Sequence, residues 1–408
     1  MPVGISASLQ AMGIDIRVPS DADVDELFHA DARAFGFHYT PERMAESLMI
    51  VDLSRYRIAV EDGAVVGVVG SYALDVTLPG GATVPMGAVT WVGVAATHRR
   101  QGLLRRLMAA CHDDIDARGE PVAMLFASEG GIYERFGYGV ATRLWGVEID
   151  KPAAALRPEL VPEPGTVKFL RGDAAAEHVA AVWERYRRTR PCETSRPANW
   201  LDFFALIRGQ ERDGSTPAWY LAHDDGYAVY RMRQHWNEGR PGHELELAEL
   251  VTVTPEARLA LWQVLLNIDL VGTITTRQLP VDDPLPYLLT NPRGVRTTAL
   301  DDGVWAAVRD VPTCFAARRY TVEDRLVVEV DGVRYAIDGG REGASVARVR
   351  SRPDLVATPD AMGALLLGGA SPTRLANGGR LTPRNDEALR RAEHFVPWPV
   401  APLSQTFY

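Results

Sequence analysis

Two segments of the chain repeat the same order of patterns: an apolar strand, a short polar turn and a leucine-rich helix. The first is GAVTWVGVAATHRRQGLLRRLM, which starts at Gly87, and the second is ELAELVTVTPEARLALWQVLL, which starts at Glu246. Strand–turn–helix units are building blocks of mixed α/β domains, so their similarity indicates a degenerate structural repeat. Two unrelated units are the alternative, because such units are common in α/β chains.

The length and charge of the chain limit what it can be. A chain of 408 residues exceeds what one hydrophobic core usually organises, so we expect two or three domains. Hydrophobic residues make up 46% and charged residues 24%, an ordinary balance for a globular protein. The formal net charge of -9 argues against nucleic acid as a partner, because a phosphate backbone needs a basic surface. An acidic protein is better suited to a cationic substrate.

The cysteines and the N-terminus bear on the cell compartment. Cys111, Cys192 and Cys314 are far apart and show neither metal-ligand spacing nor a disulfide pattern, and the histidines show no metal pattern either. The N-terminal residues lack the basic start and apolar core of a signal peptide, and no apolar run reaches the roughly 20 residues of a membrane helix. We therefore expect a soluble cytoplasmic protein with no membrane span and no metal site.

Three successive regions differ in their patterns. Helix and strand signals alternate up to about residue 155, and a second mixed region runs from about residue 165 to 300. The third region begins with three short strand patterns, GVWAAVRDV, RLVVEVDG and VRYAIDGG, and its Asp-Gly turns predict a meander. Helix patterns follow, and the sequence ends in the proline-rich FVPWPVAPLSQTFY.

The turn of the first repeated unit, RRQGLL, has the residues of a phosphate clamp. A helix N-terminus exposes backbone N–H groups that bind phosphate, and a glycine there lets the backbone approach a ligand closely. Arg99 and Arg100 add forked donors beside Gly102. A solvated helix start is the alternative, although cations there oppose the helix dipole. Because the Walker and Rossmann glycine patterns are both missing, the turn predicts a pyrophosphate site of another type.

Longer motifs around this turn resemble a known family. VGVAATHRRQGLLRRLM resembles the acetyl-CoA signature of GCN5-related N-acetyltransferases (GNATs). THRRQGLLRRLM followed by ASEGGIYERFGYGVAT is similar to the Eis family of acetyltransferases. The segment LLLGGASPTRLANGGRL and the last helix resemble the third domain of that family. The resemblance implies an α+β protein with tandem GNAT-type mixed α/β domains at residues 1–158 and 159–298, the second of them degenerate. A sterol-carrier-protein-like α+β domain at 299–408 would follow, with its C-terminus at the active site.

The resemblance also implies that the first domain binds acetyl-CoA as a cosubstrate. In the family, strand backbone lines the acetyl and pantetheine arm, and the arginine turn wraps the pyrophosphate. A splayed strand leaves one backbone N–H free for the thioester carbonyl, and Val94 is the candidate for that donor. The implied cofactor-binding residues are Val92, Gly93 and Val94 for the arm, Arg99, Arg100, Gln101, Gly102, Leu103, Leu104 and Arg105 for the pyrophosphate, and Ser128 and Glu129 from the next strand.

Acetyl transfer to an amine needs an acid that protonates the departing thiolate and a base that accepts a proton from the amine. The resemblance places the acid at Tyr133, the first tyrosine of IYERFGY, and leaves Tyr138 to the core. The base in the family is the C-terminal carboxylate, which here belongs to Tyr408. A packed aromatic residue and a loose chain end are the respective alternatives. The apolar, proline-stiffened sequence before Tyr408 argues against a loose end.

The resemblance implies an acetyl-CoA-dependent N-acetyltransferase that acts on primary amines by direct attack on the thioester, and a homohexamer. Several family members acetylate aminoglycosides, which links the family to antibiotic resistance. Here Phe37 and His38 stand where such relatives offer an acid, and the tail SQTF before Tyr408 has no glutamate. These departures favour a smaller or more apolar amine, such as an arylalkylamine, a lysine side chain or a polyamine. The alternatives are an acyl-CoA-binding regulatory protein without turnover and a transferase of a longer acyl group.

Overall fold

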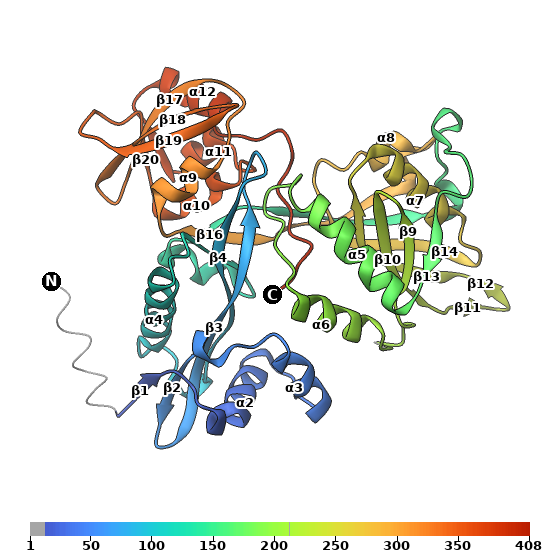
Figure 1. Ribbon diagram of the computed structural model, residues 1–408, viewed down its shortest axis with the longest axis horizontal. Coiled ribbons are helices and arrows are strands. Elements are labelled where there is room, and N and C mark those ends of the chain that lie inside the picture. The colour runs from blue at the N-terminus through green and yellow to red at the C-terminus, as the bar shows by residue number, and fades with distance from the viewer. Residues whose placement is uncertain (1–12, 212) are drawn as a thin grey trace.

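Three large β-sheets organise the molecule, which is shown as a computed structural model in Figure 1. The structure describes residues 13–211 and 213–408. In Figure 1 the first sheet, in blue and teal, lies beside the second, in green and yellow, and the third, in orange, lies above the first. Helices pack against all three sheets, so the predicted α+β class is confirmed.

The first sheet has seven strands in the order β1-β2-β3-β4-β5-β16-β6, and only the β4–β5 pair is parallel. Two helices bury apolar side chains on its opposite faces, α2 through Leu27 and α4 through Leu107. Its strands are β1 (Asp15–Arg17), β2 (Arg57–Glu61), β3 (Ala64–Thr77), β4 (Thr83–Val94), β5 (Val122–Phe126), β6 (Gly139–Val140) and β16 (Val304–Val308), and its helices are η1 (Asp21–Asp23), α2 (Val24–Phe35), α3 (Pro41–Leu48), η2 (Leu53–Arg55) and α4 (Leu103–Ala117).

The second sheet also has seven strands, in the order β15-β7-β14-β13-β10-β9-β8, with a parallel β13–β14 pair. Its core includes Trp262 of the helix α7, which is fully buried. The elements are β7 (Arg143–Asp150), η6 (Lys151–Ala153), η7 (Pro158–Leu160), β8 (Lys168–Leu170), α5 (Gly172–Tyr186), α6 (Ala198–Arg208), β9 (Trp219–His223), β10 (Gly226–Arg233), β11 (Trp236–Asn237), β12 (Arg240–Pro241), β13 (His243–Thr252), α7 (Pro255–Asn267), β14 (Val271–Leu279), α8 (Leu285–Leu288), η8 (Pro292–Gly294) and β15 (Val295–Asp302).

The third sheet has five strands in the order β19-β18-β17-β20-β21, with an antiparallel meander at β17, β18 and β19. Tyr320 and Phe395 stack beneath it with ring centroids 4.1 Å apart. The elements are α9 (Val311–Ala317), β17 (Asp324–Val330), β18 (Val333–Gly340), β19 (Gly343–Arg348), β20 (Leu355–Ala357), α10 (Pro359–Leu366), α11 (Pro372–Asn377), β21 (Leu381–Pro383) and α12 (Asp386–Phe395).

Two strands belong to a sheet that is built mainly from another region of the chain. β7 follows β6 along the chain but pairs with β14 and β15 of the second sheet. β16 pairs with β5 and β6 of the first sheet, Trp305 opposite Leu125. The expectation that GVWAAVRDV starts the meander of the third region is therefore wrong. Val304–Val308 is buried over almost its whole length, which suits a strand between two others better than a strand with a solvated face.

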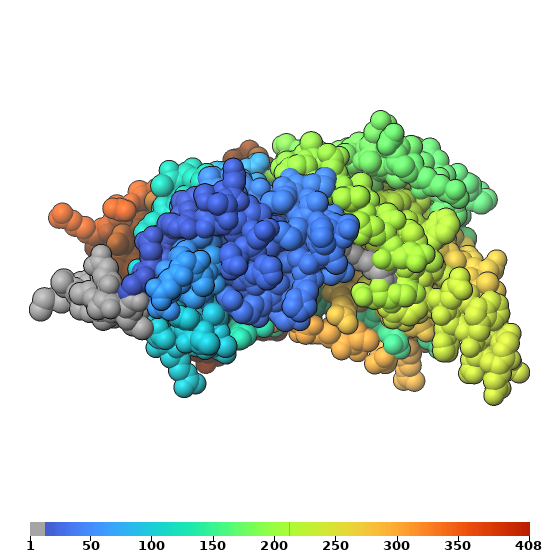
Figure 2. All heavy atoms as spheres, turned by 90° about the horizontal axis from the view of Figure 1, so that it is seen from below, coloured from blue at the N-terminus to red at the C-terminus, as the bar shows by residue number. Residues whose placement is uncertain are grey.

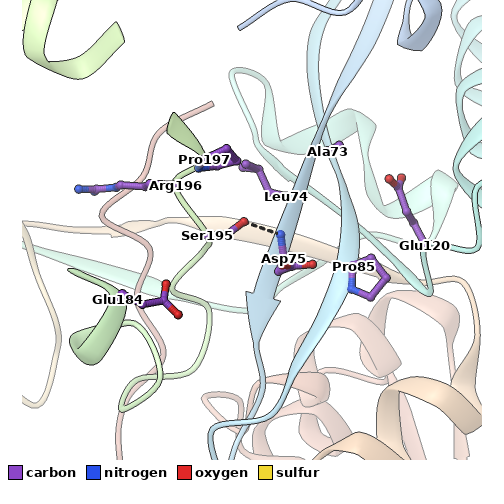
Figure 3. Close-up of a pocket in the computed structure, with 9 residues that line it drawn as sticks. All are labelled: Ala73, Leu74, Asp75, Pro85, Glu120, Glu184, Ser195, Arg196 and Pro197. Atoms are coloured by element: carbon purple, nitrogen blue, oxygen red, sulfur yellow. Dashed lines mark hydrogen bonds between the residues drawn. The ribbon is translucent and has the colours of Figure 1, made fainter. Parts of the chain in front are cut away.

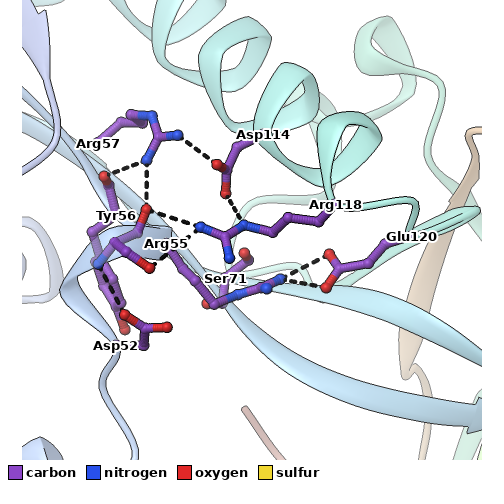
Figure 4. A network of polar contacts seen from close by, with 9 residues as sticks. Asp52, Arg55, Tyr56, Arg57, Ser71, Asp114, Arg118 and Glu120 are labelled. Carbon is purple, nitrogen blue, oxygen red and sulfur yellow. Dashed lines mark hydrogen bonds and ion pairs between the residues drawn. The ribbon is translucent and has the colours of Figure 1, made fainter.

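The C-terminal end of α4 is tied to the first sheet by arginines and carboxylates (Figure 4). Arg55 donates to both oxygens of Glu120, at 2.8 and 2.7 Å, and both residues are buried. Asp114 accepts from Arg57 and from Arg118, each at 2.7 Å. Loss of one partner of a buried pair leaves an uncompensated charge, so such pairs fix the geometry strongly. One end of α4 is thereby anchored, and its N-terminal end follows β4.

The first and second domains also meet through helices. Figure 2 shows the blue surface of the first domain against the green surface of the second. Gln210 donates to Glu46 of α3 at 2.6 Å, and Asn199 of α6 donates to the carbonyl of Met49 at 3.1 Å. These polar contacts fix α3 relative to α6.

Candidate active site

β4 passes into α4 through a turn that contains two left-handed residues. After η3 (Ala96–His98), Arg100 has a φ of 63° and Gly102 a φ of 78°. In the described chain, no side chain caps the start of α4, and its first turn holds no acidic residue. The first backbone N–H groups of the helix and the positive end of its dipole are therefore left for an anionic ligand.

The side chains around this helix start fit the same ligand. Arg99, Arg100 and Arg105 are exposed. Arg106 Nη1 and Gln101 Oε1 are buried and have no hydrogen-bond partner among the described residues. A buried guanidinium donor without a partner costs stability, and a phosphate oxygen is a strong acceptor for it. The turn thus has the donors that a diphosphate needs.

The second strand–turn–helix unit differs at this position. Thr254 caps α7, its hydroxyl accepting from the backbone N–H of Ala257 at 3.2 Å, and Pro255 and Glu256 form the first turn. The helix end is closed by its own residues, and the Glu256 carboxylate would repel an anion. The same supersecondary unit therefore has an uncapped helix start in one copy and a capped helix start in the other.

β4 and β5 separate towards the turn. Their parallel ladder runs only from Met86 to Ala88 on β4. Further along β4, the pairing with β3 shifts between Val68 and Gly70, and Trp91 adopts a φ of 52°. A β-bulge of this kind bends its strand and increases the local twist. The bulge therefore opens a gap between the two parallel strands just before the arginine turn.

The N–H group of Val94 faces this gap. The next residue, Ala95, donates its N–H to the carbonyl of Val66 on β3 at 2.8 Å. Successive N–H groups of a strand point to opposite edges, so the N–H of Val94 is directed to the β5 side, where the ladder has already ended. The Gly93 backbone lies close against α2, because a Cβ there would stand 2.6 Å from the Cβ of Ala34.

The end of β5 supplies the other side of the gap. Phe126 is the last residue of β5, and Ser128 and Glu129 follow it, both exposed. Two short helices come next, η4 (Gly130–Ile132) and η5 (Glu134–Phe136). Tyr133 lies between them, so it follows closely after the carboxyl end of β5.

The two tyrosines of IYERFGY have different surroundings. Tyr138 is fully buried, and its hydroxyl is bonded to His112 Nε2 at 2.8 Å. Tyr133 is 4% exposed, and no hydrogen bond joins its hydroxyl to another described residue. Burial, with a smaller contribution from the Glu129 charge, raises the pKa of Tyr133 to about 12. Tyr133 is therefore a protonated donor at neutral pH, while Tyr138 is engaged in the core.

The end of the chain also reaches β5. Tyr408 is 8% exposed, its ring centroid lies 5.1 Å from that of Phe126, and the ring of Phe407 lies 4.7 Å from the same ring. The ring centroids of Tyr138 and Tyr133 lie 6.0 Å apart. Both candidate residues therefore lie at the end of β5. The ring of Tyr408 contacts Phe126 of this strand, and Tyr133 follows the strand closely in sequence.

Sequence reasoning missed two features beside β4. Asp31 of α2 is 2% exposed and accepts from the Tyr39 hydroxyl at 2.8 Å, while its Oδ1 has no partner in the described chain. Burial raises the pKa of Asp31 to about 6. The ring of Tyr39 contacts those of Phe37, at 4.9 Å, and Trp91, at 6.1 Å. The aromatic residues in RAFGFHY could have indicated an aromatic cluster from the sequence. The contact with Trp91 could not have been predicted, because this residue is distant in the chain.

Two cavities lie elsewhere. One of about 310 Å³ is lined by Asp75, Glu120 and Arg196 among others (Figure 3), and one of about 470 Å³ lies near Arg319 and Trp398. None of the residues predicted for the active site lines them. In residues 13–211 and 213–408, no cluster of His, Cys, Asp or Glu could hold a metal, and no helix is long and apolar enough to cross a membrane.

Comparison with family models shows the class of protein. Residues 15–141 and residues 192–309 each match an acetyltransferase (GNAT) domain, and residues 311–404 match a sterol carrier protein domain. The chain is therefore an acetyltransferase with two GNAT domains followed by a sterol-carrier-like domain.

Similar proteins narrow the class to one family. The chain is 34% identical to N-acetyltransferase Eis of Mycobacterium tuberculosis over 399 residues, 94% of this chain and 96% of that protein. It is 32% identical to an uncharacterized N-acetyltransferase of Streptomyces avermitilis, with 96% and 98% of the two chains covered. The crystal structure of Eis1 from Mycobacterium abscessus superposes with a TM-score of 0.86 at 32% identity, covering 97% of this chain and 100% of that one. The chain belongs to the Eis family of N-acetyltransferases.

Proposed function

We propose that the chain transfers the acetyl group of acetyl-CoA to a primary amine in the first GNAT domain. The observation that carries the proposal is the uncapped start of α4 behind the left-handed residues Arg100 and Gly102. Arg99 to Arg105 hold the diphosphate, Val92 to Val94 line the arm, and Ser128 and Glu129 add contacts from the next strand. The second GNAT domain holds no cosubstrate, because Thr254 and Glu256 close its helix.

Four groups of the chain divide the chemistry between them. The N–H of Val94 donates to the oxygen of the thioester carbonyl as negative charge develops on it. The hydroxyl of Tyr133 gives its proton to the departing sulfur. The α-carboxylate of Tyr408 accepts the proton that the attacking amine loses, directly or through water. The bulge at Trp91 keeps β4 and β5 apart, so that the thioester has room between them.

The substrate we propose is an apolar amine, an arylalkylamine in preference to an aminoglycoside. The rings of Phe37, Tyr39 and Trp91 form a contiguous group beside the bulge, and Phe37 is 36% exposed. Aromatic faces bind an aromatic ring or an ammonium group, whereas a polycationic sugar needs several carboxylates. Lysine side chains and polyamines are the further amines of this proposal.

Release of free CoA over an amine panel tests the proposal. The panel holds arylalkylamines, lysine peptides, polyamines and aminoglycosides, each with acetyl-, propionyl- and malonyl-CoA. We expect turnover with acetyl-CoA and the highest kcat/KM for an arylalkylamine. Acetyl-CoA binding without turnover on any amine would instead identify a regulatory acyl-CoA-binding protein. A preference for propionyl- or malonyl-CoA would identify a transferase of longer acyl groups.

The role of the Tyr408 carboxylate has a separate test. One residue added after Tyr408 moves the carboxylate by up to about 3.5 Å, which is enough to disrupt proton transfer. We expect kcat to fall while the Kd of acetyl-CoA stays the same. An extended protein with unchanged kcat would remove Tyr408 from the mechanism.

We also propose a cytoplasmic homohexamer. A cytoplasmic location is supported by the cysteines, all three of which are free and buried, and by the need for acetyl-CoA. Light scattering on the purified protein measures the mass, and any other assembly would contradict the hexamer.

A further inference from the structure

The tail, residues 401–408, is a docked segment. In Figure 1 it leaves the third domain and ends between β3 and α6. Leu403, Ser404, Gln405 and Thr406 are buried, as is Tyr408. A frayed chain end has exposed side chains and unpaired backbone, so the burial of the tail requires a specific receiving surface.

The receiving surface is a short link between α5 and α6, residues 191–196, which extends the edge of β3. The backbone N–H of Cys192 donates to the carbonyl of Thr77 at 2.8 Å, and the N–H of Thr77 donates to the carbonyl of Glu193 at 2.9 Å. Ser195 and Asp75 exchange two further bonds, one of which Figure 3 shows. Main-chain bonds therefore fix this link relative to the first sheet.

The link binds the tail through a second set of bonds. The N–H of Leu403 donates to the carbonyl of Pro191, and the N–H of Gln405 donates to Oε2 of Glu193, each at 3.0 Å. Arg196 donates from Nε to the hydroxyl of Thr406, also at 3.0 Å. The tail thus lies in register with the link, and the link lies in register with β3, the neighbour of β4.

Glu193 is an unusual residue for this task. It is fully buried, and its Oε1 has no hydrogen-bond partner among the described residues. Burial raises its pKa to about 8, against the lowering effects of the Gln405 N–H and of Arg196 and Arg190. Six residues have groups that face it. They are Arg190, just before the link, Arg196 of the link, Tyr186 of α5, Glu249 of β13, Gln405 of the tail and Thr77 of β3.

We propose that Glu193 is a positioning residue: by accepting the N–H of Gln405 it sets the register of the tail and so the place of the Tyr408 carboxylate. The inference rests on the proposed role of that carboxylate as base. Tyr408 follows Gln405 closely, so a tail shifted by one residue would displace the carboxylate by up to about 3.5 Å. Glu193 touches neither cosubstrate nor amine in this proposal and acts only through the tail.

The test compares Glu193→Ala with Glu193→Gln. Alanine removes the acceptor, while glutamine keeps an uncharged acceptor of the same shape. For the alanine variant we expect a carboxypeptidase to release Tyr408 about tenfold faster, because one buried hydrogen bond is lost. We expect its kcat to fall by a similar factor with the KM of acetyl-CoA unchanged. Near pH 7 the glutamine variant should release Tyr408 no faster than the wild type and should keep the wild-type kcat.

The pH profile separates positioning from a purely structural role. In the docked state burial raises the pKa of Glu193 to about 8, whereas an undocked tail exposes this carboxyl to water and its pKa returns to the usual 4.5. Protonation therefore favours docking, which weakens as the pH rises from about 4.5 to about 8 and stays constant above that range. Wild-type protein should therefore release Tyr408 faster as the pH rises through this range, with a plateau above about pH 8. Glu193→Gln cannot ionise and should show no such rise. Identical profiles for the two proteins would overturn the proposal.

A change in the tail covers the case in which Glu193→Ala does not fold. Gln405→Pro removes the backbone N–H that Glu193 accepts. Gln405→Ala keeps that N–H and loses only the side-chain bond to the Leu250 carbonyl, 3.0 Å long. We expect the proline variant alone to reproduce the fast release and the lower kcat. Equal behaviour of the two variants would contradict the role of Glu193.

The outcomes distinguish this inference from the proposed function. Unchanged release of Tyr408 in Glu193→Ala and Gln405→Pro overturns the inference but leaves the carboxylate as base. Faster release with unchanged kcat also overturns the inference, because the carboxylate would then keep its place without the Glu193 bond, and the protein extended after Tyr408 tests the base separately.

Discussion

At the scale of single residues, two neighbouring tyrosines differ in the partners of their hydroxyl groups. Tyr138 bonds to His112, whereas the hydroxyl of Tyr133 stays free of other described residues. A pKa of about 12 makes Tyr133 a weak acid, so in the role that we propose for it the proton would move only as the thiolate forms. The same pKa keeps it protonated over the whole working range of pH.

Tyr133→Phe removes the proposed acid and preserves the packing of the ring. We expect kcat to fall by about a hundredfold, because general acids contribute at least that much, with the Kd of acetyl-CoA unchanged in calorimetry. Tyr138→Phe is the matched control and should lower stability through its lost bond to His112 while kcat stays within a few fold. A large loss of acetyl-CoA affinity in Tyr133→Phe would contradict its role as acid.

His112 predicts acid sensitivity of the fold. Burial, helped by the charge of Arg309, lowers its pKa from 6.5 to about 4. The unfolded chain therefore binds the proton more readily, and the contribution of the neutral His112 is present above pH 6.5 and lost as the pH falls towards 4. Between pH 7 and pH 5 the free energy of unfolding should fall by about 2 kcal/mol from this residue. Urea titrations of wild type and His112→Gln should differ by this amount, and parallel pH curves would refute it.

At the scale of elements, two helix starts of the same supersecondary type have opposite electrostatics. α4 begins after Gly102 with no cap, and α7 begins with Thr254 as its cap and Glu256 in its first turn. In α7 the threonine uses one backbone N–H and the glutamate repels an anion, whereas α4 has neither residue at these positions. The difference is local, since it lies in the residues of each turn and first helical turn.

Arg105→Glu tests the anion site at the start of α4. The change places a negative charge in the first turn, where it repels a diphosphate, and we expect the Kd of acetyl-CoA to rise about tenfold at low salt. Raising the ionic strength should reduce the difference. Arg277→Glu, an equal charge change at an exposed position of β14, should leave the Kd unchanged. A similar loss in both variants would mean that only net charge matters.

Local features of the fold were predictable, and partners distant in sequence were not. The strand, the turn and the helix around Gly102 follow from adjacent residues, as does the capped start of α7. The sheet that receives Val304–Val308 depends on β5 and β6, far away in the chain, and no local pattern specifies it. Glu193 was missed for the same reason: its significance comes from the N–H of Gln405, which only the folded chain brings to it.

At the scale of the whole molecule, the domains predicted at 1–158, 159–298 and 299–408 do not coincide with the sheets. β7 lies within the first range and belongs to the second sheet, while β16 lies within the third range and belongs to the first sheet. The boundaries themselves stay a prediction. Each of the two seven-stranded sheets therefore depends on a strand from outside its own range.

A fragment of residues 1–298 tests this dependence. It lacks β16, so β5 and β6 lose the strand between them and the apolar residues of the first sheet are exposed. We expect no cooperative unfolding transition of the first domain, measured by near-ultraviolet circular dichroism during heating. Co-expression with residues 299–408 should restore the transition. A fragment that unfolds cooperatively by itself would show that the first sheet is stable without β16.

The exchange of β7 and β16 also sets the order in which a nascent chain reaches its final form. After Val140 emerges from the ribosome, the second neighbour of β5, β16, is not synthesised until Val304, when all seven strands of the second sheet have been synthesised. Pairings between such distant residues form slowly, because a long loop must close first. The segment up to Val140 therefore has an open sheet edge until β16 is made, and chaperones that cover exposed strands should bind it during that interval.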